Sequence, residues 1–330
     1  MNRHKQAPKI AIITRTKDRN LLLERSIKSV LSQTYKDYVH VILNDGGDKE
    51  ELRSLLDQYP DDKRVVIDNK QSVGITVALN QAIRAVDSKY VSILDDDDSW
   101  APERLEMVVA HLESSKNPGA IVIMDRIIEK IEEGSIIEVS RNRWLEGVET
   151  VSLYKQCLDN YLSNGVFNYT RKVYEELEGY DEALDVAEDW DFGIRYMLKY
   201  DVDFIKTPDA LMYYHHRPDQ SGPSGNSVFA GIDNHNKALN LLQNKYLRQD
   251  IISGGLGIGY IMNNLRYERD RDQVQHEKNM AFVVRLEGHI NFVADELKQH
   301  SNIATRVLVD SINSRLFRRV ILKIKNFFSQ

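Results

Sequence analysis

The sequence predicts an α/β fold in which a mostly parallel sheet is flanked by helices and followed by a helical C-terminal extension. Short β-branched runs alternate with amphipathic helical patterns through the first part of the chain, which is typical of parallel sheets with crossover helices. Polar motifs follow directly on three of these runs, after Ile13, Leu43 and Leu94. Beyond about Pro223 the strand patterns fade, and charged segments with helical spacing take their place.

The individual strands and helices are predicted from the spacing of apolar residues. Strands are expected where short runs end abruptly in polar residues, at 10–13, 39–43, 65–67, 90–94 and 120–124. Helices are expected where apolar side chains recur at helical spacing, at 21–34, at 77–86 and from Pro102 to about 112. Ligands bind at the carboxyl ends of parallel strands, so the three polar motifs are expected to meet in one site.

The length of 330 residues allows one large domain with a smaller appendage. We expect the α/β domain to span residues 1–222 and the helical region to span residues 223–330. The glycines at 254–259 lack the spacing of a dinucleotide fingerprint and indicate a helix break. Further on, residues 283–297 carry a 3-4-3-4 apolar spacing, which fits either a helix packed on its own domain or an oligomerisation helix. The basic and apolar tail at 315–328 fits either an anionic membrane surface or packing against the protein.

The composition disfavours nucleic-acid binding and favours a cytoplasmic protein. A formal net charge of -6 gives no global attraction to DNA or RNA. No apolar run reaches the ~18 residues needed to span a bilayer, and Lys17, Asp18 and Arg19 interrupt the one candidate for a signal peptide. The single cysteine, Cys157, cannot form an internal disulfide, which fits a reducing compartment. We therefore expect a cytoplasmic location, including peripheral association with the cytoplasmic face of the membrane.

Four consecutive aspartates, Asp95 to Asp98, follow the predicted strand at 90–94. Residues two apart in an extended chain point to the same side, so Asp95 and Asp97 face one way. Like charges this close need a counter-ion, and Mg²⁺ or Mn²⁺ prefers carboxylate oxygens and often bridges them to phosphates. The alternative is a solvated turn with one aspartate as a helix cap. The position between an apolar strand and Trp100–Pro102 favours the metal site.

Two further motifs carry groups that can act in catalysis or binding. Glu188-Asp-Trp-Asp191 opens a predicted helix, where an aspartate is either an N-cap or a general base in a partly apolar setting. Tyr213-Tyr-His-His-Arg217 contains adjacent histidines, which are most often structural or at the surface. Either His215 or His216 could add an imidazole to a metal held by carboxylates, or act with the following arginine on a diphosphate.

Together these segments resemble family 2 of the inverting glycosyltransferases, which has the GT-A fold. The matching stretches occur in the family's order over roughly residues 8–220, and the ordered set is far more specific than any one stretch. They are 12–19, 29–35, 43–47, Asn69 with 72–74 and Asn80, 94–102, and 179–181 through 188–190. The opening Thr14-Arg-Thr-Lys-Asp-Arg19 is similar to a subgroup found among bacterial surface-polysaccharide enzymes.

The resemblance implies a metal-dependent, inverting transfer of a sugar from a nucleotide diphosphate to a hydroxyl of a glycan or lipid-linked glycan, as in O-antigen and capsule synthesis. The residues implied to bind the nucleotide sugar are Thr14, Arg15, Thr16, Asp45, Asn69, Asp95 and Asp96. Of these, Asp45 would accept a hydrogen bond from a pyrimidine ring N–H, which favours UDP- or dTDP-sugars.

The same resemblance implies the roles of the remaining site residues. Asp97 would ligate Mn²⁺ or Mg²⁺, and His215 or His216 would approach the metal or the diphosphate. Asp189 would be the catalytic base, and Glu188 beside it, with Trp190, would shape the acceptor site.

Two departures from the family pattern leave the donor unnamed. Many members have Pro where this chain has Arg15, and many have Arg immediately before Asn80, where this chain has Leu79. The second departure removes a cation from the nucleotide pocket, and Arg15 or Arg19 is the candidate replacement.

Three other functions compete with this one. A haloacid-dehalogenase-like phosphotransferase also carries an Asp-x-Asp after a strand, with the first aspartate as nucleophile, but usually at the first strand of the fold. A nucleotidyltransferase needs a Gly-rich phosphate loop near the N-terminus, which this sequence lacks. A catalytically inactive sugar-binding subunit would share the fold, and a turnover assay distinguishes it.

Overall fold

The computed structural model describes residues 7–132, 135–144, 148, 150–218, 225, 232–255 and 257–263. The chain divides into two compact units, Met1–Gly259 and Tyr260–Gln330. All of the labelled strands and helices belong to the first unit, because the described part of the second is limited to residues 260–263. The predicted boundary after residue 222, the apolar spacing at 283–297 and the basic tail at 315–328 lie outside the described residues.

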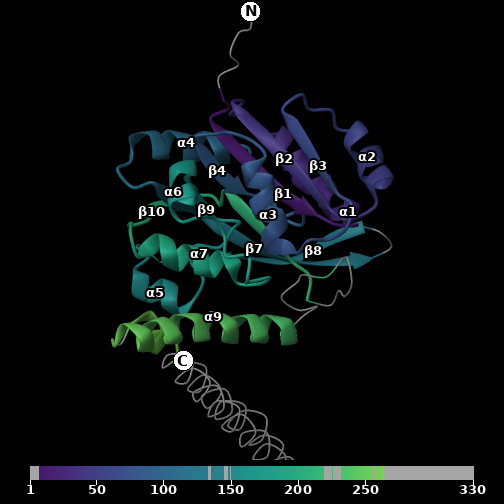
Figure 1. Ribbon diagram of the computed structural model, residues 1–330. Coiled ribbons are helices and arrows are strands. Elements are labelled where there is room, and N and C mark those ends of the chain that lie inside the picture. Colours follow the sequence, from purple (N-terminus) through teal and green to yellow (C-terminus); the bar gives the residue numbers. More distant parts are fainter. Residues whose placement is uncertain are drawn as a thin grey trace, which may run out of the picture. The chain divides into compact units, whose positions relative to one another are not determined.

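The described residues of the first unit form a mostly parallel seven-stranded sheet, which confirms the predicted α/β class (Figure 1). The strand order is β10-β6-β9-β4-β1-β2-β3, and of these strands β9 alone runs antiparallel to its neighbours. The strands are β1 (Ile10–Thr16), β2 (Tyr38–Asp45), β3 (Arg64–Asn69), β4 (Tyr90–Ile93), β6 (Gly119–Val122), β9 (Phe167–Thr170) and β10 (Asp203–Ile205).

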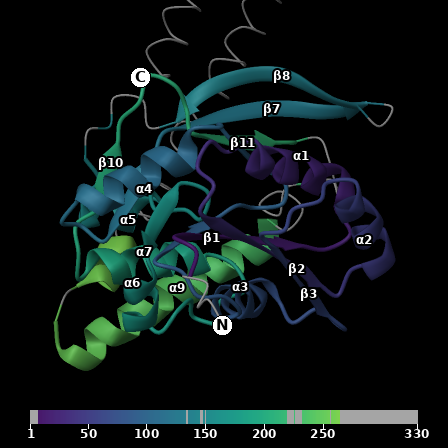
Figure 2. The same ribbon diagram turned by 90° about the horizontal axis from the view of Figure 1, so that it is seen from above.

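Helices connect these strands and flank the sheet (Figure 2). They are α1 (Asn20–Leu31), α2 (Lys49–Asp57), α3 (Ile75–Arg84), α4 (Arg104–Ser114), α5 (Leu153–Leu158), α6 (Arg171–Glu176), α7 (Glu188–Met197) and α9 (Ile232–Ser253). The helix predicted at 21–34 ends at Leu31, because the Thr34 N–H donates to the Pro102 carbonyl at 2.9 Å instead of continuing the helix. Sequence spacing missed α2, α5 and α6, which have nine, six and six residues.

Both faces of the sheet are covered because successive side chains of a strand point to opposite sides. In β2, Ile42 packs in an apolar cluster with α1 and α2, including Leu23 and Leu52. Its neighbours Val41 and Leu43 belong to the larger core cluster, which includes residues of α3 and α4. Burying one such side chain contributes about 1.5–3 kcal/mol, so these apolar runs anchor the strands whose ends carry the polar motifs.

A second, smaller sheet was not predicted from the sequence. Among the described residues it has four strands in the order β5-β11-β7-β8, and Figure 2 shows β7 and β8 as a long hairpin. The strands are β5 (Ser99–Trp100), β7 (Met124–Glu132), β8 (Ser135–Trp144) and β11 (Met212–His216). The predicted strand at 120–124 is therefore two strands, β6 in the first sheet and β7 in the second. The parallel pairing of β11 with β7 sets His215 opposite Ile127 and brings the histidine motif to the end of β4.

The carboxyl ends of β1, β2 and β4 meet at one edge of the main sheet, as predicted. Thr16 at the end of β1 is in register with Asn44 of β2. The Leu94 N–H, just after β4, donates to the Ile13 carbonyl of β1 at 2.9 Å. Three segments far apart in the chain therefore contribute side chains to the same edge.

The helix α9 is bound to α7 through a buried aspartate. Lys245 Nζ lies 2.6 Å from Asp191 Oδ1 and 2.8 Å from Asp181 Oδ2, and the Tyr246 hydroxyl donates to Asp191 Oδ1 at 3.0 Å. The helix ends at Ser253, and Gly254 follows with φ of 72°, a left-handed conformation that glycine adopts without strain. The predicted helix break at the glycine cluster is confirmed.

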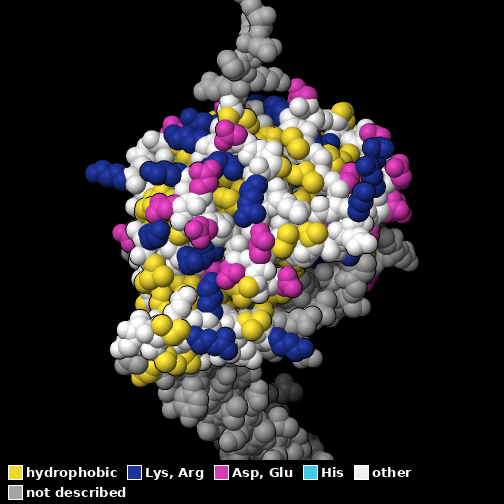
Figure 3. Space-filling view, viewed as in Figure 1, with side chains coloured by type: hydrophobic (Ala, Val, Ile, Leu, Met, Phe, Trp, Pro, Cys, Tyr) yellow, Lys and Arg dark blue, Asp and Glu magenta, His cyan; other side chains and the backbone are white. Residues whose placement is uncertain are grey.

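The surface of the described residues carries charges of both signs. Basic and acidic side chains are interspersed over the face in Figure 3, and apolar side chains gather over its lower part, where α9 lies. The exposed apolar residues of α9 are Leu241, Ile251 and Ile252. Among the described residues, no helix has the length and apolar character needed to span a membrane.

The contact between α9 and α7 yields a stability prediction. Replacing Asp191 with Ala removes the shared acceptor of Lys245, Tyr246 and Arg195, and each loses a hydrogen bond in a partly or fully buried setting. We expect the free energy of unfolding, measured by urea denaturation, to fall by about 1–3 kcal/mol. The exposed Asp201→Ala variant is the control and should change it by less than about 0.5 kcal/mol. Equal effects of the two substitutions would contradict this account of how α9 is held.

Candidate active site

The acidic loop, Asp95–Asp98, lies between β4 and β5 and is largely buried. Asp96, Asp97 and Asp98 are only 3%, 8% and 2% exposed. The Asp98 N–H donates to the Asp95 carbonyl at 3.1 Å, and the Asp98 carboxylate accepts the backbone N–H of His215 at 3.1 Å. Burial, reinforced by the charges of its neighbours, raises the pKa of Asp95 to about 7. The loop therefore concentrates negative charge that calls for a cationic partner.

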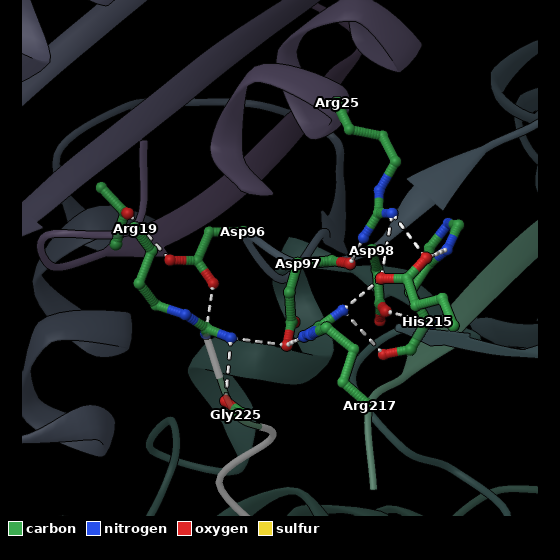
Figure 4. A network of polar contacts seen from close by, with 10 residues as sticks. Arg19, Arg25, Asp96, Asp97, Asp98, His215, Arg217 and Gly225 are labelled. Carbon is green, nitrogen blue, oxygen red and sulfur yellow. Dashed lines mark hydrogen bonds and ion pairs between the residues drawn. The ribbon is translucent and has the colours of Figure 1, made fainter. Parts of the chain in front are cut away.

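Two guanidinium groups from distant parts of the chain pair with Asp97 (Figure 4). Arg19 Nη2 and Arg217 Nη2 donate to the same oxygen, Asp97 Oδ2, at 2.7 and 2.6 Å. Arg19 Nη1 also donates to Asp96 Oδ1 at 2.6 Å. Although burial alone would raise it, these two cations hold the pKa of Asp97 below its usual value. Asp97 is thus ionised and paired, whereas Asp95 next to it is disfavoured as an anion.

A buried carboxylate of the second sheet, Glu129 in β7, joins Arg217 to α1. Arg217 Nη1 donates to Glu129 Oε1 at 2.6 Å, and Arg25 Nη1 donates to Glu129 Oε2 at 2.9 Å. Arg25 also donates to the Asp97 carbonyl oxygen. Against the effect of burial, hydrogen bonds from His215 and the charge of Arg25 lower the pKa of Glu129 to about 2. Glu129 is therefore an anion that fixes the two arginines on either side of it.

The structure places His215 beside the acidic loop but directs its ring to other partners. Its Nε2 lies 2.8 Å from the Ser99 hydroxyl and its Nδ1 lies 2.9 Å from Glu129 Oε2. Burial lowers the pKa of His215. The ring of His216 lies beside Tyr214, with centroids 6.0 Å apart. A metal-binding role for either histidine stays a prediction, and for His215 it requires the ring to exchange partners.

The donor set of the acidic loop fits a hard divalent cation. Within the described residues no group of three or more His, Cys, Asp or Glu side chains is arranged to hold a metal. Mg²⁺ does not require such a group, because it is usually bound by one or two carboxylates together with phosphate oxygens and water. Asp97, with the poorly compensated carboxylate of Asp95 beside it, supplies ligands of that kind.

The predicted nucleotide-binding residues of β1 lie in three different environments. Thr16 donates its hydroxyl proton to Asp96 Oδ2 at 2.8 Å, so it belongs to the acidic loop's network. Arg15 is close enough to Asp95 and Glu188 for its charge to oppose the rise in their pKa values. The Thr14 side chain is fully buried, and its hydroxyl lies 3.0 Å from His40 Nε2. Burial lowers the pKa of His40 to about 3, so this neutral pair belongs to the core.

Asp45, at the end of β2, accepts hydrogen bonds from the last residue of β3 and from the segment that follows it. Its carboxylate accepts hydrogen bonds from the Asn69 amide at 3.0 Å and the Ser72 hydroxyl at 2.7 Å. It also accepts the N–H groups of Val73 and Gly74, at 2.9 and 3.3 Å. Burial opposes ionisation, but these four donors lower the pKa of Asp45. The structure brings Asp45 and Asn69 together in a contact that holds the 69–74 segment, and nucleotide binding by the two residues stays a prediction.

The start of α7 carries a second pair of acidic side chains. Ala187, just before it, has φ of 65°, a left-handed conformation that strains an alanine and is typical of functional sites. Asn164 donates its amide to Glu188 Oε1 at 3.2 Å and its N–H to Asp189 Oδ2 at 3.4 Å. Burial and the neighbouring Asp189 raise the pKa of Glu188 to about 8, and burial also raises that of Asp189. Trp190 donates its ring N–H to the Gln156 carbonyl and so points toward α5.

The acidic loop and the start of α7 form one site. The charge of Asp189 contributes to the raised pKa of Asp95, and the charge of Asp95 contributes to that of Glu188. The geometry agrees, because Asn164 donates to Glu188 and Asp189, and a Cβ on the next residue, Gly165, would lie 3.7 Å from Asp98 Oδ2 of the acidic loop. Two acidic motifs that are far apart in the sequence therefore meet, one compensated by arginines and the other by amide donors.

Sequence reasoning missed Arg25, Glu129 and Asn164. For Glu129 a signal was present, since it shares the alternating phase of Ile127 in β7 and so places a carboxylate in a row of buried residues. Arg25 is a charged residue next to the buried Ser26 of α1, a helix that was predicted from its apolar positions alone. Arg25 and Glu129 are 104 residues apart in the sequence, so local spacing could not pair them.

The raised pKa of Glu188 predicts a pH dependence of stability. Between about pH 4.5 and pH 8 the native chain holds this proton while the unfolded chain releases it, so Glu188 makes stability fall as pH rises. Glu188→Gln keeps the acceptor for Asn164 and removes the titration. We expect its stability relative to the unsubstituted protein to be higher at pH 8 than at pH 5, in urea unfolding series. The exposed Glu175→Gln variant should show no such trend, and a parallel pH response of both variants would refute the assignment.

Sequence and structure comparisons agree with this geometry. The family model described as glycosyl transferase family 2 matches residues 11–177, about half of the chain. WcaA of Escherichia coli K12, a glycosyl transferase ascribed to colanic acid biosynthesis, is 28% identical over 200 residues, covering 59% of this chain and 68% of WcaA. An uncharacterized glycosyltransferase of Methanocaldococcus jannaschii is 29% identical over 176 residues, which cover 52% of this chain and 59% of that protein.

Solved structures support the fold. S. aureus TarS residues 1–349, in complex with UDP-GlcNAc, superimpose with a TM-score of 0.58 at 17% identity, covering 97% of this chain and 89% of that one. The mannosyltransferase PcManGT of Pyrobaculum calidifontis, in complex with GDP-Man and Mn²⁺, gives a TM-score of 0.54 at 15% identity, covering 97% and 85%. These likenesses, with the parallel sheet and its helices, confirm the predicted GT-A fold. With the family model matching across the acidic loop and the strands that carry it, the chain belongs to glycosyl transferase family 2 and is an enzyme of glycosyl transfer.

Proposed function

We propose that this enzyme transfers a sugar, with inversion, from a UDP- or dTDP-sugar to a hydroxyl of a glycan acceptor. The observation that carries the proposal is the convergence of the acidic loop and the start of α7. Asn164 donates to Glu188 and Asp189, and a Cβ on the next residue, Gly165, would lie 3.7 Å from Asp98 Oδ2. One cluster is suited to a charged diphosphate through its cations, and the other to a proton transfer. An inverting displacement needs both functions on opposite sides of one anomeric carbon.

Asp189 is the proposed general base. It would remove the proton from the acceptor hydroxyl as that oxygen bonds to the anomeric carbon, while the bond from that carbon to the diphosphate oxygen breaks. Burial raises its pKa, and a base whose pKa is closer to neutral accepts a proton more effectively. Asn164 holds both Asp189 and Glu188, and Glu188, with a pKa of about 8, is largely protonated at neutral pH.

On the donor side, Asp97 would hold a divalent cation, with Asp95 as the second carboxylate. Such a cation supplies Lewis-acid stabilisation of the negative charge on the departing diphosphate. Asp96, Thr16 and Arg19 form the hydrogen-bonded support of this loop. Arg15 lies near both acidic clusters, which suits it to the nucleotide phosphates or the transferred sugar.

The similar proteins do not decide between donors, and the donor and acceptor classes rest on different observations. TarS was solved with UDP-GlcNAc and PcManGT with GDP-Man and Mn²⁺, so the GT-A fold accommodates different nucleotide sugars. The uridine or thymidine preference rests on Asp45. A role in surface-polysaccharide synthesis rests on the likeness to WcaA, and the lipid-linked acceptor follows from that role. Membrane-surface and oligomer roles of the C-terminal residues stay predictions.

The competing functions do not agree equally well with the family and the fold. Family membership sets aside the phosphotransferase, in which an aspartate would attack phosphorus, and the acidic loop follows β4 rather than the first strand. An inactive sugar-binding subunit is the alternative that a turnover assay distinguishes.

The donor site is tested by thermal unfolding with UDP, dTDP, GDP and CMP, each with and without Mn²⁺. A ligand present at 100 times its Kd stabilises the native state by about 2.7 kcal/mol. We expect a rise in Tm with UDP or dTDP and Mn²⁺, lost on addition of EDTA and in Asp97→Ala. The exposed Asp57→Ala variant of α2 is the matched control and should respond like the unsubstituted protein. A folded protein that responds to none of the four nucleotides would defeat the proposal.

The base is tested by Asp189→Asn, which keeps the shape of the side chain and the acceptor for the Trp190 N–H. We expect kcat for nucleoside diphosphate release in the presence of acceptor to fall by about 10²–10⁴-fold. The Tm shift caused by the nucleotide should be retained, because Asp189 lies outside the donor's diphosphate contacts. Asp57→Asn serves again as the control. Retention of most of the activity by Asp189→Asn would remove Asp189 from this role.

A further inference from the structure

The contacts of Arg19 and Arg217 with Asp97 share one pattern. Each guanidinium places its Nη2 on Asp97 Oδ2 and its Nη1 on a different carboxylate, which is Asp96 for Arg19 and Glu129 for Arg217 (Figure 4). Each arginine therefore has one nitrogen anchored on another carboxylate and donates with the other to Asp97, the proposed metal ligand. If the Nη2 contact is given up, the anchored nitrogen still holds the side chain in place.

Both arginines approach the carboxylate that a divalent cation would need. Arg217 is fully buried and Asp97 is 8% exposed, so little water screens the contact. Two positive charges at 2.6 and 2.7 Å from one carboxylate oxygen oppose the binding of a third cation there. Moving the two Nη2 groups away without a new acceptor would leave N–H donors unsatisfied in a largely buried setting, which is unfavourable. A metal ion alone therefore competes with the arginines for Asp97 and offers their Nη2 groups no new acceptor.

A nucleoside diphosphate changes this balance because it brings the anion that the arginines would lose. Guanidinium groups bind phosphate oxygens through paired N–H donors with favourable geometry. The Arg19 side chain is 18% exposed, so it is accessible to a ligand, and its Nη2 also lies 3.3 Å from the Gly225 carbonyl oxygen. Transfer of the two Nη2 groups from Asp97 to the diphosphate would free Asp97 for a cation at the same step.

Resting on the proposed function, we propose that Arg19 and Arg217 are diphosphate-binding residues that occupy Asp97 until the donor arrives, so that metal and donor bind cooperatively. Without nucleotide the chain binds Mn²⁺ weakly, because the arginines hold Asp97. With nucleotide the arginines move to the phosphates and Asp97 takes the metal. By linkage, Mn²⁺ must strengthen nucleotide binding by the same factor as the nucleotide strengthens Mn²⁺ binding.

The test measures Mn²⁺ binding by the EPR signal of the free ion, on protein first stripped with EDTA, and so does not depend on turnover. We expect UDP, or the diphosphate found by the thermal screen, to tighten Mn²⁺ binding to the unsubstituted protein by at least about fivefold. Without nucleotide, Arg217→Met and Arg19→Met should each bind Mn²⁺ at least about fivefold more tightly than the unsubstituted protein. In the absence of metal, the same variants should bind the nucleoside diphosphate more weakly.

Arg25→Met is the matched control. It removes an equal charge from the same network, but Arg25 contacts the Asp97 carbonyl oxygen and Glu129 and makes no contact with the Asp97 carboxylate. It should tighten Mn²⁺ binding clearly less than the two test variants. The Arg217 side chain is fully buried, whereas the Arg19 side chain is partly exposed. If Arg217→Met shows no cooperative thermal transition and is therefore unfolded, Arg19→Met decides alone.

The possible failures are distinguishable. Arginine variants that bind Mn²⁺ no more tightly than the unsubstituted protein or than Arg25→Met would overturn the inference, even if the nucleotide still binds. Unchanged diphosphate affinity in both variants would likewise overturn it and leave the proposed function intact. Failure of every nucleotide to bind the unsubstituted protein would instead reject the proposed function itself.

Discussion

The burial of adjacent carboxylates at the end of β4 is the constraint on which much of this structure depends. Charges removed from water must be paired, and Asp97 finds its partners in Arg19, just before α1, and Arg217, just beyond β11. The second sheet serves the same requirement, because β7 brings Glu129 against Arg217 and Arg25. The smaller sheet and the pairing of β11 with β7 therefore supply partners to the acidic loop and to α1.

The two acidic clusters meet that constraint in opposite ways. Around Asp97 and Glu129 three arginines keep the carboxylates ionised, and the pKa of Glu129 falls to about 2. At the start of α7 the compensation comes from neutral groups, chiefly Asn164 and backbone N–H donors, and the pKa of Glu188 rises to about 8. Carboxylates in one site whose environments push their pKa values apart can take different roles. Asp97 and Glu129 are suited to holding charge, and Glu188 is suited to exchanging a proton near neutral pH.

The sequence could predict the parts of this arrangement that depend on local periodicity. Strands such as 10–13 and 39–43 are buried apolar runs, and the edge where they end could be located from the polar residues that follow them. The second sheet could not be predicted, since β11 pairs with β7 across more than eighty residues and no local pattern encodes that register. The contacts of the His215 ring could not be predicted for the same reason. The sequence placed a histidine near the acidic residues, but its choice of Ser99 and Glu129 depends on a strand pairing that only the fold provides.

Asp45 and Asp97 also share a property that bears on donor affinity. Each was expected to contact the donor or its metal, and each already has partners within the chain, four neutral donors for Asp45 and two guanidinium groups for Asp97. A pyrimidine N–H arriving at Asp45 must therefore replace a contact with the 69–74 segment or share its oxygen. The net gain from a hydrogen bond exchanged in this way is far smaller than the bond itself, because one satisfied contact replaces another. Donor recognition in such a site depends on differences between competing partners, so a nucleotide that satisfies one end and leaves the other unpaired gains little.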